Sequence, residues 1–312
     1  MARSLDCEAQ VLSISEGFDR AGCKASLHVV DLQTNEAIGV DPDVPVVLAS
    51  VFKVLVALEF FAQTESGVLD PARPMLVEPR DHTAGGSGLS DFIDRAEVSL
   101  RDLCGLMLTI SDNTATDILV DVVGLDRINE RALHCGCSST FIESDLQAVW
   151  DGIGRDMGFP DYATYAAAQA GRLGVDAQRH STDPVRIDAC AAYDPSRTNR
   201  STARDMTGLL AAVWNNTGAA PEACARLRSV MSRQFSTRIG RGMPPGTSIA
   251  AKTGSLTGRI NNEIGVVTHH DGKAYAIAVF TRAHRPFERT TSIEAEMAAG
   301  SAAAIAFHRR ND

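Results

Sequence analysis

Apolar residues form alternating runs near both ends of this chain and helical blocks between them. The alternating runs lie at 25–31, 37–40, 248–251, 264–266 and 274–280, and each predicts an antiparallel strand. Two of the runs are close to the N-terminus and three to the C-terminus. We therefore expect the two ends of the chain to meet in one antiparallel sheet, with the helical blocks forming a second layer against it.

The helical blocks predict one helix at each end of the chain and three in the middle. Their expected bounds are about 7–20, 51–61, 103–110, 115–123 and 292–308. The block 51–61 is too apolar for a surface helix and should run through the core. Ser99 to Asp102 reads as a capping box that opens the helix at 103.

Length and composition fit one domain of mixed α/β (α+β) class. The 312 residues are 44% hydrophobic, enough to bury a full core without a second domain. We assign 1–312 to this single domain. Its α/β part is expected from 1–50 and 220–312, and its helical part from 51–219.

Charge and hydropathy narrow the classes of partner. The formal net charge is −9, with acidic and basic residues interspersed, which argues against a nucleic-acid surface. No apolar run reaches membrane length, and the first ten residues carry Asp6 and Glu8 where a signal peptide has a basic segment. The expected partner is a small molecule or peptide, with neither nucleic acid nor membrane involved; the sequence leaves the oligomeric state open.

Cysteine usage favours a reducing compartment. The seven cysteines are odd in number and scattered without a framework, as expected for reduced thiols in the cytoplasm. A trimmed secreted form stays the alternative. The segment 134–137, His-Cys-Gly-Cys, lacks a second pair of ligands at zinc spacing. We therefore expect no metal and no cofactor.

The segment Ser50-Val51-Phe52-Lys53 places a hydroxyl and an amine one helical turn apart at the start of the core helix. The partial positive charge and free N–H groups of a helix N-terminus can hold an oxyanion. An enclosed lysine is disfavoured in its charged form, so its pKa falls and the neutral amine can take the proton of Ser50. These two residues predict a serine nucleophile with a lysine base.

Two further segments follow in order, Ser111-Asp112-Asn113 in a short connection between helices and Lys252-Thr253-Gly254 on a strand. A strand beside the site can add the backbone of a ligand to the sheet, and Lys252 supplies positive charge for a carboxylate. Each segment alone is ordinary turn or strand-end chemistry. Together with the first segment they predict one acyl-transfer site.

This set of three segments resembles that of the serine-acylating β-lactamases and penicillin-binding proteins, class A β-lactamases in particular. The resemblance implies a five-stranded antiparallel sheet flanked by helices, beside an all-α region. It also implies catalytic roles for Ser50 as nucleophile, Lys53 as general base and Ser111 as proton relay, with Lys252 beside them. The substrate-binding residues it implies are Asn113, Thr253, Gly254, Ser255 and Arg238.

Within that set, the backbone N–H groups of Ser50 and Ser255 would form the oxyanion hole. Arg238 lies fourteen positions before Lys252 and resembles an arginine that assists carboxylate binding in some relatives. The alternative for Arg238 is a solvated side chain within the run 233–241.

The deacylating residue of class A enzymes is missing. Their glutamate, which activates the water that frees the acyl-enzyme, falls at Leu146 when positions are counted from the family-like segment 136–140. Glu143, Asp145 and Asp151 are nearby, but none has the family's surrounding sequence. The acylation machinery is expected to be complete and the deacylation machinery absent or rebuilt.

The chain is also longer than the family requires between Ser111 and Lys252. We place an insertion around 151–199. It would border the active site, either as a lid that shapes the substrate or as a tolerated surface elaboration.

The expected activity is that of a serine hydrolase that forms an acyl-enzyme on Ser50 with a β-lactam or a related carboxylate-bearing amide or ester. β-Lactam hydrolysis, with a role in antibiotic resistance, is the leading specific activity. One alternative is a peptidase, esterase or acyltransferase of natural-product or cell-wall peptides. The other is a β-lactam-binding protein that is acylated without turnover.

Overall fold

The computed structural model describes residues 2–256, 258–286 and 290–310. At its centre is a five-stranded antiparallel sheet, which confirms the architecture expected from the alternating runs. The strand order is β2-β1-β9-β8-β7, with bounds β1 Cys23–Asp31, β2 Ala37–Val40, β7 Ser248–Leu256, β8 Ile260–Thr268 and β9 Ala274–Ala283. The two ends of the chain meet where β1 pairs with β9, with Leu27 opposite Val279.

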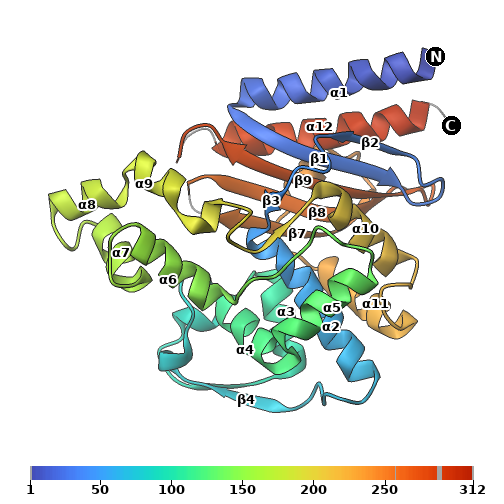
Figure 1. Ribbon diagram of the computed structural model, residues 1–312. Helices are drawn as coiled ribbons and strands as arrows, with labels where there is room; N and C mark the ends of the chain where they lie inside the picture. Colours follow the sequence, from blue (N-terminus) through green and yellow to red (C-terminus); the bar gives the residue numbers. More distant parts are fainter. Residues whose placement is uncertain (1, 257, 287–289, 311–312) are drawn as a thin grey trace.

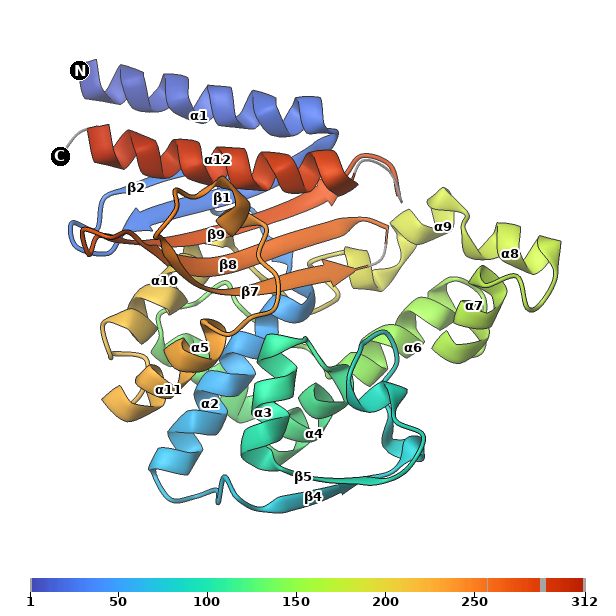
Figure 2. The ribbon, with the colours of Figure 1, turned by 180° about the vertical axis from the view of Figure 1, so that it is seen from behind.

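Both faces of the sheet are covered, and successive residues of β9 show how. Ala276, Ala278 and Phe280 belong to the core shared with the central helices. The alternate residues Ile277 and Val279 pack on the other side, under helices α1 (Ala2–Ala21) and α12 (Thr290–Arg310). This period of two is that of a strand buried on both faces. Figures 1 and 2 show α1 and α12 side by side across the sheet.

The second layer is helical, with the buried helix α2 (Lys53–Glu65) at its centre. The other helices of this layer are α3 Leu100–Thr109, α4 Asn113–Val123, α5 Leu125–His134, α6 Leu146–Asp156, α10 Ala203–Trp214 and α11 Pro221–Met231. Helix α3 begins at Leu100 because the Ser99 hydroxyl caps it, accepting from the backbone N–H of Asp102. Helix α11 packs on α2 and α3, so the helical layer includes residues beyond 219.

Shorter elements complete the chain. Helices α7 Tyr162–Gln169, α8 Val175–Ser181 and α9 Pro184–Ala189 extend outward beyond the end of α6 (Figures 1 and 2). Two small antiparallel pairs join β3 Val46–Val47 to β6 Arg200–Ser201 and β4 Pro74–Val77 to β5 Ala96–Ser99. Single 3-10 turns are η1 Ala49–Phe52, η2 Pro79–Asp81, η3 Leu89–Asp91, η4 Ala191–Tyr193 and η5 Ile239–Gly242.

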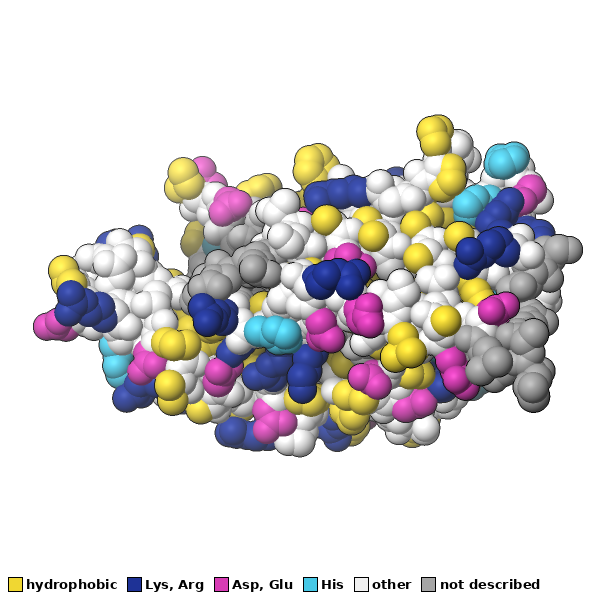
Figure 3. Space-filling model, turned by 90° about the horizontal axis from the view of Figure 1, so that it is seen from above, with side chains coloured by type: hydrophobic (Ala, Val, Ile, Leu, Met, Phe, Trp, Pro, Cys, Tyr) yellow, Lys and Arg dark blue, Asp and Glu magenta, His cyan; other side chains and the backbone are white. Residues whose placement is uncertain are grey.

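The surface carries charges of both signs. Figure 3 shows basic and acidic side chains interspersed over the face above α1 and α12, with apolar side chains scattered singly or in small groups. Among the described residues, no helix is both long and apolar enough to cross a bilayer. All seven cysteines are unpaired.

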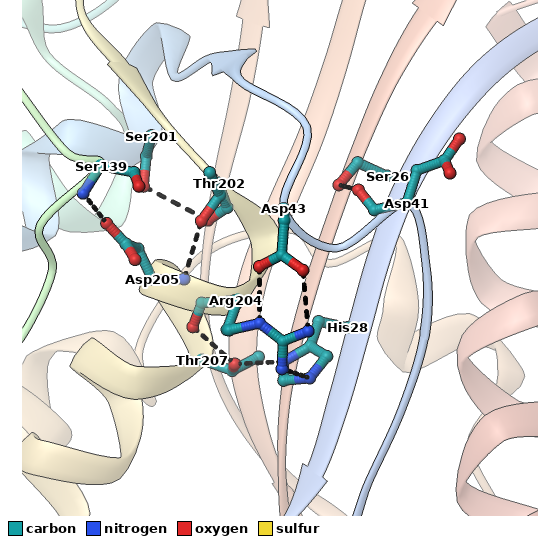
Figure 4. A network of polar contacts seen from close by, with 10 residues as sticks. All are labelled: Ser26, His28, Asp41, Asp43, Ser139, Ser201, Thr202, Arg204, Asp205 and Thr207. Atoms are coloured by element: carbon teal, nitrogen blue, oxygen red, sulfur yellow. Dashed lines mark hydrogen bonds and ion pairs between the residues drawn. The ribbon is translucent and has the colours of Figure 1, made fainter.

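A polar network fastens helix α10 to strand β1 (Figure 4). Arg204 forms a bidentate ion pair with Asp43 at 2.6 and 2.9 Å. His28 of β1 has its Nδ1 2.6 Å from the Thr207 hydroxyl. Burial is the main reason that the pKa of His28 is lowered to about 4, so the ring is neutral at pH 7. The network therefore attaches the helical layer to the sheet without a buried positive charge on the histidine.

Candidate active site

Ser50 lies in the turn η1, directly before the buried helix α2. The preceding residue, Ala49, has a φ of +46°. An L residue in this left-handed region costs about 1–2 kcal/mol, and such backbone strain is concentrated at functional sites. Ser50 is half-buried and lines a pocket of about 380 Å³. Its hydroxyl is therefore presented to a ligand-sized space at the start of a helix.

Lys53 is the first residue of α2 and is fully buried. Its Nζ donates to the backbone carbonyl of Ser111 and to Oδ1 of Asn113, both at 2.7 Å. It also lies 3.1 Å from the Ser111 hydroxyl. Within the described part of the chain no hydrogen bond joins Lys53 to Ser50. Catalytic hydrogen bonds often shorten only when substrate binds.

The Ser111 hydroxyl lies between two lysines. Nζ of Lys252, on β7, is 3.1 Å from the Ser111 hydroxyl and 2.9 Å from the carbonyl oxygen of Thr253. Lys252 is 1% exposed. A hydroxyl that contacts one amine on each side can accept a proton from one and donate its own to the other. The fold brings Ser111 and Lys252 together across 141 positions of sequence.

Burial shifts both lysines toward their neutral forms. Desolvation, followed by the positive charge of Lys252, holds the pKa of Lys53 well below its usual value. Desolvation, followed by the charge of Arg238, lowers the pKa of Lys252 to about 7. A neutral amine has two N–H bonds and one lone pair. In neutral Lys53 the carbonyl oxygens of Ser111 and of the Asn113 side chain accept the two N–H bonds, so the lone pair faces a hydroxyl, which in this structure is that of Ser111.

The turn between α3 and α4 positions Ser111 and Asn113. Ser111 has a φ of +63°. Asp112 is fully buried and caps α4 by accepting from the N–H of Ala115 at 2.9 Å. Asn113 donates from Nδ2 to the carbonyl of Ala84 at 2.8 Å. Asp112 therefore shapes the turn, while Ser111 and Asn113 line the pocket.

Strand β7 packs directly on the backbone around Ser50 because residue 254 is glycine. A Cβ at Gly254 would lie 3.0 Å from the carbonyl oxygen of Leu48 and 3.1 Å from the backbone nitrogen of Val51. The Thr253 N–H points away from β8, since it donates to the Gln234 side chain at 3.3 Å. Antiparallel strands alternate the direction of their N–H groups. The Ser255 N–H therefore also points away from β8.

Arg238 lies beside this strand. Its Nη2 donates to the Ser255 hydroxyl at 2.7 Å, and its Nε pairs with Glu294 at 2.9 Å. The side chain is 12% exposed. It is therefore fixed next to Ser255, and the alternative of a solvated arginine does not hold.

The pocket also contains residues outside the three motif segments, among them Leu146, which the count from 136–140 had placed at the position of the class A glutamate. They come from the Gly-rich loop at 85–87, from one face of α6, and from the segment after α9: Gly85, Gly86, Ser87, Leu146, Val149, Trp150, Ala192, Thr198 and Asn199. Leu146, Val149 and Trp150 are at positions i, i+3 and i+4, the spacing of residues on one face of a helix. The family count had placed Leu146 at the site, but nothing local showed that Val149 and Trp150 also turn toward Ser50.

Leu146 lies in the pocket, whereas the three neighbouring carboxylates do not line it. Asp145 caps α6 through the N–H of Ala148 at 2.8 Å. Glu143 faces Arg200 at 3.5 Å. Asp151 accepts from Nε2 of Gln147 at 3.0 Å. Each carboxylate is thus engaged outside the pocket.

Asp117 of α4 fixes the position of Leu146. It accepts from the N–H groups of Leu146 and Gln147 at 2.8 and 2.9 Å and from the Thr83 hydroxyl at 2.8 Å. Burial is the main reason that the pKa of Asp117 is raised to about 6. Ionised Asp117 at neutral pH thus holds the first turn of α6 against the pocket.

The C-terminal end of the expected insertion, 151–199, lies at the pocket. Asn199 accepts from the N–H groups of Glu143 and Ser144 at 2.8 and 3.1 Å. Its backbone carbonyl accepts from the N–H of Leu48 at 3.0 Å, two residues before Ser50. This end of the segment therefore forms part of the site, while α7 to α9 extend away from it.

Comparison with known proteins relates the whole chain to one family. The model of the beta-lactamase enzyme family matches residues 9–307. The curated "Beta-lactamase regulatory protein BlaB" of Streptomyces cacaoi is 29% identical, over 94% of this chain and 96% of its own length.

Solved structures give the same fold. A β-lactamase from Sphaerobacter thermophilus DSM 20745 is 22% identical with a TM-score of 0.72, over 94% of this chain and 95% of that one. PBP-A is 20% identical with a TM-score of 0.73, over 96% of each chain. A leucine-to-glutamate variant of PBP-A, solved as an acyl-enzyme complex with penicillin G, has the same identity and TM-score over 97% of each chain.

Proposed function

We propose, from the premise that this chain belongs to the beta-lactamase enzyme family, that it forms an acyl-enzyme on Ser50 with β-lactams or related carboxylate-bearing amides and esters. The observation that carries the proposal is the buried pair of lysines that share the Ser111 hydroxyl. The acylation chemistry is inferred from this geometry, and the solved relatives share the fold that carries it.

The proposed reaction transfers one proton from Ser50 to Lys53 and one from Ser111 to the departing nitrogen. Lys53 removes the proton of Ser50, and the Ser50 oxygen attacks the carbonyl carbon. The N–H groups of Ser50 and Ser255 stabilise the oxyanion. The carbon–nitrogen bond then breaks while Ser111 protonates the departing nitrogen and recovers from Lys53 the proton that Lys53 took from Ser50. Lys252 and Arg238, behind Ser255, attract the carboxylate of the donor.

Intact mass spectrometry with penicillin G tests this proposal. The protein is expected to gain the full mass of one penicillin, because ring opening releases no fragment, and the labelled peptide should contain Ser50. The Ser50→Ala variant is the control and should gain no mass. An adduct on another residue, or no adduct with β-lactams and activated esters, would overturn the proposal.

A second candidate function is a regulatory protein that stays acylated. Two observations favour it, the name of the Streptomyces cacaoi relative and the leucine at position 146 of the pocket. Without a carboxylate to activate water, acylation should be faster than release. A chromogenic cephalosporin should then give a burst of about one equivalent followed by slow turnover. Fast turnover without a burst would favour the hydrolase over the regulator.

The pH dependence of acylation should reflect the two lysines. Lys252, with a pKa of about 7, is protonated below that pH and attracts a carboxylate, but it is neutral above it. We therefore expect kcat/KM for a carboxylate-bearing donor to fall as the pH rises above about 7. It should also fall at lower pH, where Lys53 becomes protonated and cannot act as a base.

Two controls separate these effects. Lys252→Arg keeps its charge at high pH, so the alkaline decline should move upward. An activated ester without a carboxylate should show no decline of this kind in the natural sequence. An identical alkaline decline in both controls would contradict the role given to Lys252.

A further inference from the structure

We propose that Glu263 is a positioning residue that holds Arg238 in place to bind the carboxylate of the donor. This inference rests on the proposed function, in which Arg238 attracts that carboxylate. Glu263 lies on β8 directly opposite Thr253 of β7, and its side chain is fully buried. It takes no part in the proposed proton transfers, so its contacts must show what it does.

The carboxylate of Glu263 fixes the backbone at the start of the turn η5. Its Oε2 accepts from the backbone N–H groups of Arg238 and Ile239, both at 2.7 Å. Arg238 is the residue before η5, and Ile239 is the first residue of the turn. Hydrogen bonds of this length are typical of an ionised acceptor. One oxygen of Glu263 therefore determines where the backbone of Arg238 lies.

A glutamate at this buried position has a cost in stability. Its second oxygen, Oε1, is buried and has no hydrogen-bond partner among the described residues. Burial is the main reason that the pKa of Glu263 is raised, against the opposing effect of its hydrogen bonds from Ile239, Thr237 and Arg238. A buried carboxylate with an unpaired oxygen destabilises the folded state, whereas an apolar side chain of similar volume does not. The gain from Glu263 is therefore expected in the site and not in the stability of the fold.

The guanidinium of Arg238 is fixed on three sides. Its Nε pairs with Glu294 of α12 at 2.9 Å, and its Nη1 donates to the carbonyl of Asn262 at 2.9 Å. Its Nη2 donates to the hydroxyl of Ser255 at 2.7 Å. A guanidinium carries five N–H bonds and three are used in this way, so two have no acceptor among the described residues. These two N–H bonds remain for the oxygens of a carboxylate at the Ser255 side of the pocket.

The contact between Glu263 and Arg238 involves the backbone. Within the described part of the chain, Glu263 accepts from Arg238 only at its backbone N–H. The guanidinium pairs instead with Glu294, which also pairs with Arg241 at 3.1 Å. Replacing Glu263 therefore leaves the side-chain partners of Arg238 in place but frees the backbone from which the side chain extends. A shift of about 1 Å in such a group is enough to weaken its contact with a ligand.

The test compares two ligands that differ by one charge. Penicillin G and its methyl ester are titrated by calorimetry into the Ser50→Ala protein, which cannot be acylated at that position. Penicillin G is expected to bind on the order of 10²-fold tighter, because its carboxylate accepts hydrogen bonds from charged groups and the ester does not. Adding Glu263→Met removes both acceptor oxygens and keeps a side chain of similar length. It should reduce the preference by about tenfold and leave the affinity for the ester within about threefold, since only the contact to the carboxylate is lost.

Two further variants separate the hydrogen bonds of Glu263 from its charge. Glu263→Gln is neutral but keeps an oxygen that can accept from both N–H groups, so it should retain most of the preference. Glu263→Asp keeps the charge, but its shorter side chain withdraws the acceptor from the turn, so it should lose part of the preference. Thermal melting verifies that each protein is folded, and Glu263→Asp decides the test where Glu263→Met is unfolded.

Two controls connect the effect to Arg238. In the Arg238→Ala background, Glu263→Met should change the preference by no more than about twofold, because residues that act through one another are not additive. Glu59→Gln neutralises a different buried carboxylate, which pairs with Arg131 at 2.8 Å and is not among the described residues that line the pocket. It should leave the preference unchanged.

Several results would overturn the inference. These are a preference that survives both Glu263→Met and Glu263→Asp, an equal loss of affinity for both ligands, a loss in Glu263→Gln as large as in Glu263→Met, and an undiminished effect of Glu263→Met in the Arg238→Ala background. Equal binding of the two ligands to Ser50→Ala, or no binding of either, would also overturn it.

The proposed function is tested separately, by acylation of the protein with its natural Ser50. Acylation without these effects contradicts only the role of Glu263. A preference that depends on Glu263 without acylation contradicts only the proposed activity.

Discussion

Replacing Lys53 with alanine is expected to slow the acylation of Ser50 by about 10²–10⁴-fold, the usual contribution of a positioned general base. Lys53 is fully buried, and burial lowers its pKa well below the ordinary value for lysine. Its amine can therefore accept a proton at neutral pH. Rapid-quench mass spectrometry with penicillin G gives the acylation rate directly.

Two substitutions control for charge and folding. Lys53→Arg should not restore the rate, because a guanidinium group stays protonated. Lys53→Met keeps most of the side-chain volume and should be as slow as alanine while remaining folded in a thermal melt. An unchanged acylation rate in Lys53→Ala would mean that another group removes the proton of Ser50.

The second large effect concerns release of the acyl group. Leu146→Glu is expected to accelerate hydrolysis of the acyl-enzyme by about 10²–10⁴-fold, because it introduces a carboxylate that can activate water. Leu146 and Ser50 line the same pocket. The backbone N–H of Leu146 is held in place because it donates to the Asp117 carboxylate at 2.8 Å. The lifetime of the penicillin adduct, followed by intact mass after excess penicillin is removed, measures the change.

The matched control is Leu146→Gln, which has a similar shape but no basic oxygen, and it should leave the lifetime of the adduct nearly unchanged. Glu143→Gln, Asp145→Asn and Asp151→Asn should also have little effect, since these carboxylates are engaged outside the pocket. Equal rates in the glutamate and glutamine variants would exclude base catalysis at position 146. A much longer lifetime in any of the three amide variants would identify that residue as the deacylating base.

The sequence by itself determined the features that depend on short-range geometry. The period of two predicted the strands of the central sheet, and their grouping near both termini predicted that the two ends of the chain would meet in it; the structure makes that contact between β1 and β9. The polar segment from Ser99 predicted a helix start there, and α3 begins at Leu100, three residues before the expected 103, with the Ser99 hydroxyl as its cap. The three-residue spacing of Ser50 and Lys53 placed them one helical turn apart. All of these follow from backbone geometry repeated over a few residues.

Only the tertiary structure decided how the distant parts of the site meet. Ser111 contacts Lys53 across 58 positions and Lys252 across 141, and no local pattern encodes such a contact. The burial of Arg238 beside Ser255 was likewise undecided, because a run of arginines looks the same whether it is solvated or packed.

The apolar side of the pocket depended on the path of the chain after α5. The helical pattern of α6 shows that one face is apolar, but it does not give the direction in which that face points. The hydrogen bonds of Asp117 and the close packing of Trp150 on Gly85 set that direction. Orientation of this kind arises from contacts between elements far apart in sequence, which is why it required the fold.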